Sequence, residues 1–369
     1  MLIKSLKIVG GCLLIGILVL IFLLLPTKAE KLETENNALG YVELLKQAKN
    51  SQPNSNVYAS SQITPDNPLF EGVLALQRGR YGLAEQKLKL LMEAGNLDAM
   101  FWYAETILGS SVYATQEAGD LFLKAANAGH AYSALKLDPT TRDCELYLGY
   151  RCSEDWIEKG EVLLKARAEQ GDVKAQYYAN VIKKPRSEED YQRNIDLVTQ
   201  AANNGYYMPL IETIKRLERY NSLDNKKKQA IVKLVTLAAN NNFVPAIAAS
   251  YKYTKDKNPQ QAEELLLKLA RLGNRMAINA TFHFDFQALQ QGDDSKFFNA
   301  YKFALVREII FRKNNNTESM GWAIVRKEIR PFRDGEKDHI KLAAEEFINQ
   351  MTPMIYIDEM HPQYTRFDH

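Results

Sequence analysis

The chain is poor in cysteine and has no excess of either charge. Its 369 residues include only three cysteines, too few for a dense framework of disulfides. Lysine and arginine number 47 against 45 aspartates and glutamates, for a net charge of +2. A nucleic-acid-binding domain usually carries a clear basic excess, so this balance argues against such a partner. What the chain has is apolar mass, 46% of its residues, enough for roughly two domains or one elongated array.

Sequence motifs of catalysis are also missing. The chain has no glycine-rich phosphate loop, no His-Glu-x-x-His pair and no nucleophile elbow. Its strongest grouping of acids and histidines is at the C-terminus: Asp358, Glu359 and His361, with Asp368 and His369 nearby. Such a group suits a metal ion or general-base chemistry, but no other spaced ligands accompany it, and a polar docked tail explains it better. We therefore expect no enzyme activity, no metal and no cofactor; a hydrolase built on this cluster is the minor alternative.

The N-terminus carries one long hydrophobic run. Residues 8–25 contain no charged or strongly polar side chain, and Pro26 follows them. A helix of this length covers about 27 Å, close to the hydrocarbon thickness of a bilayer. The apolar core of a cleaved signal peptide is shorter, about 7–15 residues, and the exit site at residues 27–29 is a poor one. We therefore predict an uncleaved membrane anchor, with a cleaved signal and a buried soluble helix as alternatives.

Lysines on the two sides of this run bear on its orientation. Lys4 and Lys7 precede it without any acid, whereas Lys28 and Lys31 follow it among glutamates. The positive-inside rule counts two basic residues on each side, and the free α-amino group and the short tail then favour a cytoplasmic N-terminus. In a bacterium, the chain would be a single-pass protein of the inner membrane with its body in the periplasm.

Cys144 and Cys152 are the only cysteines outside the hydrophobic run. Eight residues along one straight helix span about 12 Å, too far for a disulfide. Gly149 lies between them, and a turn there would bring them together, where an extracytoplasmic compartment would oxidise them. Two unrelated buried thiols are the alternative. Two cysteines without nearby histidines do not make a metal site.

A repeat runs through the middle of the chain and is marked by residues 31 to 42 positions apart. A bulky apolar residue lies seven positions before each marker, Met or Ala lies three before it, and a small residue or proline lies four after it. The positions eleven, seven and three residues before the marker lie along one stripe of a helix. The marker itself suits the left-handed position that follows a helix. The pattern predicts stacked antiparallel helix pairs, because one pair alone exposes too much apolar surface. The markers are Gly95, Gly129, Gly171, Gly205, Asn242 and Gly273.

The sequence AGDLFLKAANAG at residues 118–129 resembles the second-helix pattern of the Sel-one-like repeat family, which is related to the tetratricopeptide repeat. Residues 262–277 match the same pattern, whereas the family's Leu-Gly-x-x-Tyr motif is mostly lost and Asn242 replaces a glycine. The resemblance covers about residues 68–290. It implies a right-handed α-solenoid whose concave face usually binds proteins or peptides. A paired-cysteine subset of the family is secreted, and Cys144 and Cys152 are similar to it in spacing.

We divide the predicted all-α chain into four parts. Residues 1–27 are a cytoplasmic stub and transmembrane signal anchor, and residues 28–67 are a tether with a short helix at 38–49. Residues 68–291 form the repeat solenoid. Residues 292–369 form a C-terminal helical cap, with helices expected at 295–313, 318–330 and 335–350. The tail, residues 351–369, is too apolar to be free, and we expect it to lie extended on the last helices.

Aromatic residues crowd the first helices of the repeats. Consecutive helical positions cannot all face one core, so some of these rings should reach the concave surface, where Trp and Tyr make good anchors for a partner. Packing between repeats is the alternative use of the same side chains. The concave-face candidates are Trp102, Tyr103, Tyr178, Tyr207 and Tyr251.

These observations predict a non-catalytic, membrane-anchored scaffold that binds another protein or peptide in the bacterial envelope and binds no nucleic acid. Some anchored members of the Sel-one-like repeat family act as immunity proteins against secreted toxic enzymes. The resemblance therefore implies that role, with a secreted effector as the partner. An assembly factor or regulator of envelope machinery is the competing role.

Overall fold

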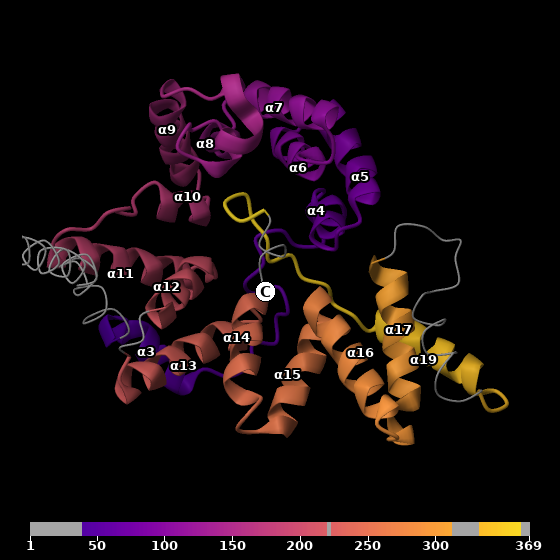
Figure 1. Cartoon of the computed structure of the whole chain (residues 1–369). Helices are drawn as coiled ribbons and strands as arrows, with labels where there is room; N and C mark the ends of the chain where they lie inside the picture. The colour runs from indigo at the N-terminus through magenta and orange to yellow at the C-terminus, as the bar shows by residue number, and fades with distance from the viewer. Residues whose placement is uncertain (1–38, 220–222, 312–331, 363–369) are drawn as a thin grey trace, which may run out of the picture.

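The computed structural model describes residues 39–219, 223–311 and 332–362, and within these ranges it contains helices and no strand. The helices follow one another around an arc (Figure 1), which confirms the predicted all-α array. No helix in these ranges is long and apolar enough to cross a bilayer, and the predicted anchor at residues 8–25 lies outside them. In chain order the α-helices are α3 (Val42–Asn50), α4 (Phe70–Gln77), α5 (Tyr81–Glu93), α6 (Leu97–Ile107), α7 (Val112–Asn127), α8 (Ala131–Lys136), α9 (Asp155–Glu169), α10 (Val173–Tyr178), α11 (Glu188–Asn203), α12 (Met208–Arg219), α13 (Asn225–Asn240), α14 (Val244–Thr254), α15 (Pro259–Arg271), α16 (Arg275–Gln290), α17 (Phe297–Phe311) and α19 (Glu336–Asn349).

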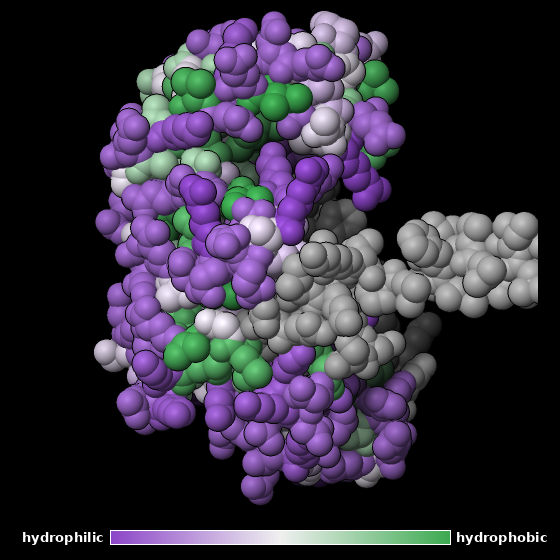
Figure 2. Space-filling model, turned by 90° about the vertical axis from the view of Figure 1, so that its left-hand side faces the viewer, coloured by the Kyte–Doolittle hydropathy of each residue, from purple (hydrophilic) through white to green (hydrophobic). Residues whose placement is uncertain are grey.

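The wall of the arc is two helices thick, and successive helices pack on each other. The even-numbered helices from α4 to α14 lie toward its inner side, and α5, α7, α9, α11 and α13 lie toward its outer side (Figure 1). Seen from one side, the molecule is mostly hydrophilic, with apolar side chains in separate patches (Figure 2). On this side, the helix pairs therefore bury most of their apolar side chains against their neighbours and leave a mostly polar surface.

Each repeat marker forms the same helix-ending corner. All six markers have a positive φ, from 62° at Asn242 to 94° at Gly129 and Gly171. The amide after each marker donates to a carbonyl five residues earlier, as Asn96 N does to Leu91 O at 3.1 Å, which is the Schellman arrangement. Among the described residues, Asn242 is the only non-glycine with a positive φ. The left-handed corners are therefore as the repeat pattern predicts, since Asn tolerates this conformation better than most residues.

The residue after the marker also begins the next helix. Asn96, His130, Asp172 and Asn274 are N-caps whose side chains accept a hydrogen bond from the first turn of the following helix. Ser133, which is the polar exception among the small residues of the repeat, is bonded at 2.8 Å to His130 Nδ1, and both residues are buried. Two adjacent residues therefore close one helix and open the next.

The bulky residues seven positions before the markers form the core between helix pairs. None is more than 8% exposed, and the small residues four positions after the markers are also buried, so the next helix approaches closely. Full burial of one such bulky side chain stabilises the fold by about 1.5–3 kcal/mol. The six bulky residues are Leu88, Phe122, Leu164, Val198, Val235 and Leu266.

A disulfide closes the insertion between the second and third markers. Cys144 begins a five-residue π-helix, and Gly149, with φ of 55°, turns the chain so that Cys152 returns to it. The two cysteine Cα atoms are 6.0 Å apart. Arg151 in the same loop pairs with Asp120 of α7 at 2.8 Å. The structure thus joins the two predicted cysteines through a turn at the predicted glycine, and an ion pair fixes the loop on the wall.

Residues 51–67 follow the predicted short helix, α3, which packs on α13. Their polar composition predicts a tether, but the segment is held at two repeat markers. Asn54 N donates to Asn240 O at 2.7 Å, and the side-chain amide of Asn242 donates to Asn54 O at 3.0 Å. At Gly205 a Cβ would lie 2.7 Å from the carbonyl oxygen of Ala59, so this corner needs glycine for the close approach as well as for its φ.

Helices α17 and α19 are the first and last of the three predicted C-terminal helices, and they pack on each other; the middle one, 318–330, lies outside the described residues. After α19 the chain runs extended across the inner side of the arc (Figure 1). The prediction of an extended, docked tail is therefore right about its conformation and wrong about its location. Its partners include α4, α10 and α12, because those helices carry polar groups that match it.

Candidate functional site: the inner groove

Residues 351–362, which we call the docked segment, bind the inner side of the arc through main-chain hydrogen bonds. The N–H groups of Thr352 and Met354 donate to carbonyls at the end of α15, at 3.0 and 3.1 Å. On the opposite wall, Gln77 of α4 donates its amide N–H to Met354 O at 2.8 Å and accepts the N–H of Tyr356 at 2.9 Å. Because these bonds are made to the backbone, they recognise an extended chain and not a particular side chain.

Four consecutive apolar residues of the docked segment, Met354 to Ile357, are at most 8% exposed. Alternate residues of an extended chain point to opposite sides, so both sides must be covered. Residues 51–67 supply part of this cover, since Ser61 Oγ donates to Ile355 O at 3.0 Å. We call the surface that surrounds the docked segment the inner groove; it consists of α4, α10, α12 with Tyr206 just before it, the end of α15 and residues 51–67.

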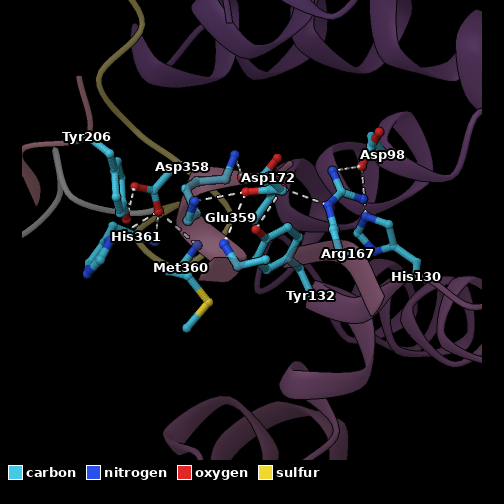
Figure 3. Close-up of polar contacts among 12 residues, drawn as sticks. Asp98, His130, Tyr132, Arg167, Asp172, Tyr206, Asp358, Glu359, Met360 and His361 are labelled. Carbon is cyan, nitrogen blue, oxygen red and sulfur yellow. Dashed lines mark hydrogen bonds and ion pairs between the residues drawn. The ribbon is translucent and has the colours of Figure 1, made fainter. Parts of the chain in front are cut away.

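Asp358 follows the apolar stretch and is the centre of a polar anchor (Figure 3). One carboxylate oxygen accepts the hydroxyl of Tyr206 at 2.9 Å, and the other accepts the N–H groups of Met360 and His361 and lies 3.0 Å from His361 Nδ1. Burial raises the pKa of Asp358, but the charge and hydrogen bond of His361, with Lys174 and Tyr206, bring it below the ordinary value. Asp358 is therefore a buried, ionised and hydrogen-bonded carboxylate.

Glu359 forms a buried ion pair with Lys174 of α10. The Nζ and Oε2 atoms are 2.9 Å apart, and the two side chains are 7% and 4% exposed for Lys174 and Glu359. Burial lowers the pKa of Lys174, but the charges of Glu359, Asp172 and Asp358 raise it to a net value above the ordinary one. The ammonium stays charged at neutral pH, so the inner groove presents a fixed positive charge to the chain that occupies it.

His361 lies between two carboxylates. Its Nδ1 is 3.0 Å from Asp358, and its Nε2 is 2.7 Å from Glu212 of α12. Burial lowers the pKa of His361, but the charge of Asp358 and the hydrogen bonds to both carboxylates raise it to about 10. A general base must be unprotonated at its working pH, whereas this imidazole is protonated at neutral pH. The geometry therefore makes His361 a cationic anchor of the docked segment.

A second set of polar contacts continues from α6 to α10 (Figure 3). Asp98 lies 3.0 Å from His130 Nε2 and 2.9 Å from Arg167. Arg167 Nε donates to Asp172 at 2.8 Å, and Asp172 also accepts the hydroxyl of Tyr132 at 2.9 Å. Burial raises the pKa of Asp98, but His130 and Arg167 lower it to about 2. These pairs connect three successive repeats beside the Lys174 ion pair.

Three residues of this site share one position in the repeat, which is not part of the pattern that predicted the helix pairs. Asp98, Tyr132 and Lys174 each lie three residues after a marker, where the later repeats have methionine or proline. At this position the first three repeats have polar residues and the later ones have apolar residues. This difference is the sequence signal that identifies the repeats with a polar inner side. Gln77 and Glu212 carry no such signal, because their role depends on a segment far away in the sequence.

The five predicted aromatic anchors divide into two groups. Trp102, Tyr103 and Tyr207 are at most 7% exposed, so they belong to the core, and the prediction that they reach a partner is wrong. Tyr178 is half-buried and lines a cavity of about 560 Å³ together with Met360. The ring of Tyr251 is also half-buried and lines a second cavity.

The cavity at Tyr251, which we call the α14 groove, has a volume of about 710 Å³ and lies between α12, α14 and α16. Its lining combines apolar residues such as Ile214 and Met276 with charged ones. Asn274 also lines it and donates to the hydroxyl of Tyr356 at 3.3 Å. Asn274 therefore borders both the α14 groove and the docked segment.

Metal ligands are not assembled at this site. Within residues 39–219, 223–311 and 332–362, no three His, Cys, Asp or Glu side chains are placed to hold a metal ion. Asp368 and His369, the other members of the predicted acid and histidine cluster, lie outside these ranges.

The chain matches no protein-family model, and no curated protein matches it in sequence. A fold of packed helices hosts many functions. Function must therefore be inferred from the chemistry of the inner groove itself.

Proposed function

We propose that this protein is a non-catalytic scaffold that binds an extended segment of another protein. One observation carries the proposal: the inner groove holds residues 351–362 in extended form, through backbone hydrogen bonds and paired charges. A surface that recognises an extended backbone within its own chain has the chemistry to bind one from a partner. The repeated corners and buried stripes also support a right-handed solenoid of Sel-one-like repeats, whose concave face usually binds proteins or peptides.

We place this scaffold in the bacterial envelope, anchored in the inner membrane by residues 8–25 with its body in the periplasm. The uncharged run of these residues supports the anchor. The disulfide between Cys144 and Cys152 supports an oxidising compartment, because cytosolic thiols are normally kept reduced.

The specific role that we propose is that of an immunity protein, which neutralises a secreted toxic effector by binding it. This role rests on the resemblance to anchored members of the Sel-one-like repeat family. Assembly or regulation of envelope machinery is the alternative, and the two roles differ in the partner. A neighbouring gene for a secreted toxin would favour immunity, whereas neighbours for wall synthesis would favour assembly.

Site-specific photo-cross-linking in cells tests the binding function on the full chain. We place a photoreactive amino acid at Met276, which is 50% exposed in the α14 groove, and in a matched control at Tyr113, which is 85% exposed at the start of the outer helix α7. We expect a discrete protein adduct at position 276 and none at position 113, with mass spectrometry naming the partner. Absence of an adduct at 276 at native expression would refute the binding function.

A further inference from the structure

We infer that the inner groove selects partner segments of one charge pattern, and that the docked segment competes with them as a ligand built into the chain. The pattern is a short apolar stretch in extended conformation, then two adjacent carboxylates, then a cation two residues later. Residues 354–361, with the sequence MIYIDEMH, have this pattern. This inference rests on the proposed function and names the class of partner that the groove takes.

Three side chains of the inner groove each contact one of the three charged residues of the docked segment. Tyr206 donates to the first carboxylate, that of Asp358, at 2.9 Å. Lys174 pairs with the second, that of Glu359, at 2.9 Å, and Glu212 accepts from the cation, His361, at 2.7 Å. While the groove is occupied, Lys174 is only 7% exposed, so its ammonium cannot turn to water. An occupant without the second carboxylate would leave this buried ammonium without its hydrogen-bonded ion-pair partner, which is strongly unfavourable.

The helix pairs are held together by their stripes and corners, and the docked segment packs on them from the inner side. The stripe residues, such as Leu88 and Phe122, are buried between helices, and the corners close on carbonyls of their own helix. The docked segment supplies no stripe residue and closes no corner; its apolar side chains, Met354 to Ile357, join the core from the inner side, and its backbone bonds carbonyls at the end of α15. Its release therefore uncovers the inner groove and leaves the helix pairs packed, which is what an exchangeable ligand requires.

Covalent attachment gives the docked segment a high effective concentration, of millimolar order for a short connection. A partner segment with the same contacts therefore binds the intact chain more weakly than it would bind an open groove. Weakening the docked segment alone should raise the affinity for a segment supplied in trans.

A labelled synthetic peptide of residues 351–362 tests this on the full-length protein in detergent, by fluorescence anisotropy. We expect it to bind the chain carrying Asp358→Asn and Glu359→Gln at least ten times more tightly than the unaltered chain. Adding Lys174→Met to that chain should reduce its affinity for the peptide by at least tenfold. A control peptide with the same two acid-to-amide changes should bind at least ten times more weakly than the unaltered peptide.

Equal affinity for all chains, or no binding to a chain that retains its helical circular dichroism, would overturn the inference. If the altered chain loses helical signal, the measurement moves to the unaltered one. There, excess isotope-labelled peptide should accelerate hydrogen exchange of the chain's own amides at residues 354–357, and unchanged exchange would refute the competition.

The two proposals fail in different ways. An adduct at Met276 that excess peptide does not reduce, with no peptide binding that depends on Lys174, leaves the binding function standing and removes the charge pattern. Peptide binding that depends on Lys174, with no adduct in cells, supports the charge pattern and removes the proposed function.

Discussion

Replacing Lys174 by methionine would leave the carboxylate of Glu359 buried without its cation. The two side chains are 7% and 4% exposed and 2.9 Å apart, and removing one member of such a pair destabilises a protein by about 3–5 kcal/mol. Replacing both members by methionine removes both buried charges, which is often neutral or stabilising. We therefore expect a coupling free energy of about 2 kcal/mol or more between the two positions.

The location of each residue makes the two single variants differ. Glu359 belongs to the docked segment, so in Lys174→Met it can enter water if the segment detaches, and the loss is limited to the free energy of docking. Lys174 belongs to α10, so in Glu359→Met it stays buried for as long as the segment is docked, with Asp172 as its remaining neighbouring charge. We expect the first change mainly to release the docked segment and the second to lower the stability of the array as well.

Urea denaturation followed by circular dichroism, with hydrogen exchange of residues 354–357, measures both effects. Lys174→Met should accelerate exchange in those residues with little change in the urea midpoint, whereas Glu359→Met should lower the midpoint. The double variant should recover most of the lost stability. If the effects of the two single changes simply add in the double variant, the ion pair does not anchor the segment and the reasoning is wrong.

Three further changes test the corners, the histidine anchor and the disulfide. Gly171 has a φ of 94° and open space for a Cβ, so Gly171→Ala should lower the free energy of unfolding, measured with urea, by about 1–2 kcal/mol. Gly82 also has open space but lies in a helix, so Gly82→Ala should not lower it. Equal urea midpoints for the two variants would contradict the left-handed corner. Because the pKa of His361 is raised from 6.5 to about 10, its stabilising contribution should be complete below pH 6.5 and disappear as pH rises through 10, and His361→Gln should remove that part of the pH dependence of the urea midpoint. Reducing Cys144–Cys152, which closes a short loop, should lower stability by about 2–3 kcal/mol, while Cys144→Ser/Cys152→Ser should not respond to reductant.

The corners and the core stripe could be predicted because both depend on local chemistry. A helix that ends in the Schellman arrangement needs a residue that tolerates positive φ, so the sequence pattern alone aligns Asn242 with five glycines. The stripe could be recognised because residues seven and three positions before a corner lie on one helical face. Where a partner was local, as Ser133 is to His130, even the polar exception has a short-range explanation.

The site could be predicted only in part. The composition of the tail indicates docking, but its location depends on contacts such as that of Gln77 with Met354, which no local pattern encodes. Packing of α6 against α5 and α7 also decides the burial of its aromatic residues. Helix periodicity predicts that one face of α6 is open, whereas the structure covers it, and Trp102 is fully buried.

The route of the docked segment changes how the array should unfold. In most repeat proteins each unit contacts only its neighbours, so stability is nearly a one-dimensional sum and the ends can melt before the middle. Here one strand of chain bridges α4, α10, α12 and the end of α15. It connects helices in the first and last thirds of the array, so unfolding of either end must also break contacts with the other. Unfolding should therefore be cooperative across the whole arc while the segment is bound. Displacement of the segment by a partner would make the arc more flexible and let its ends unfold separately.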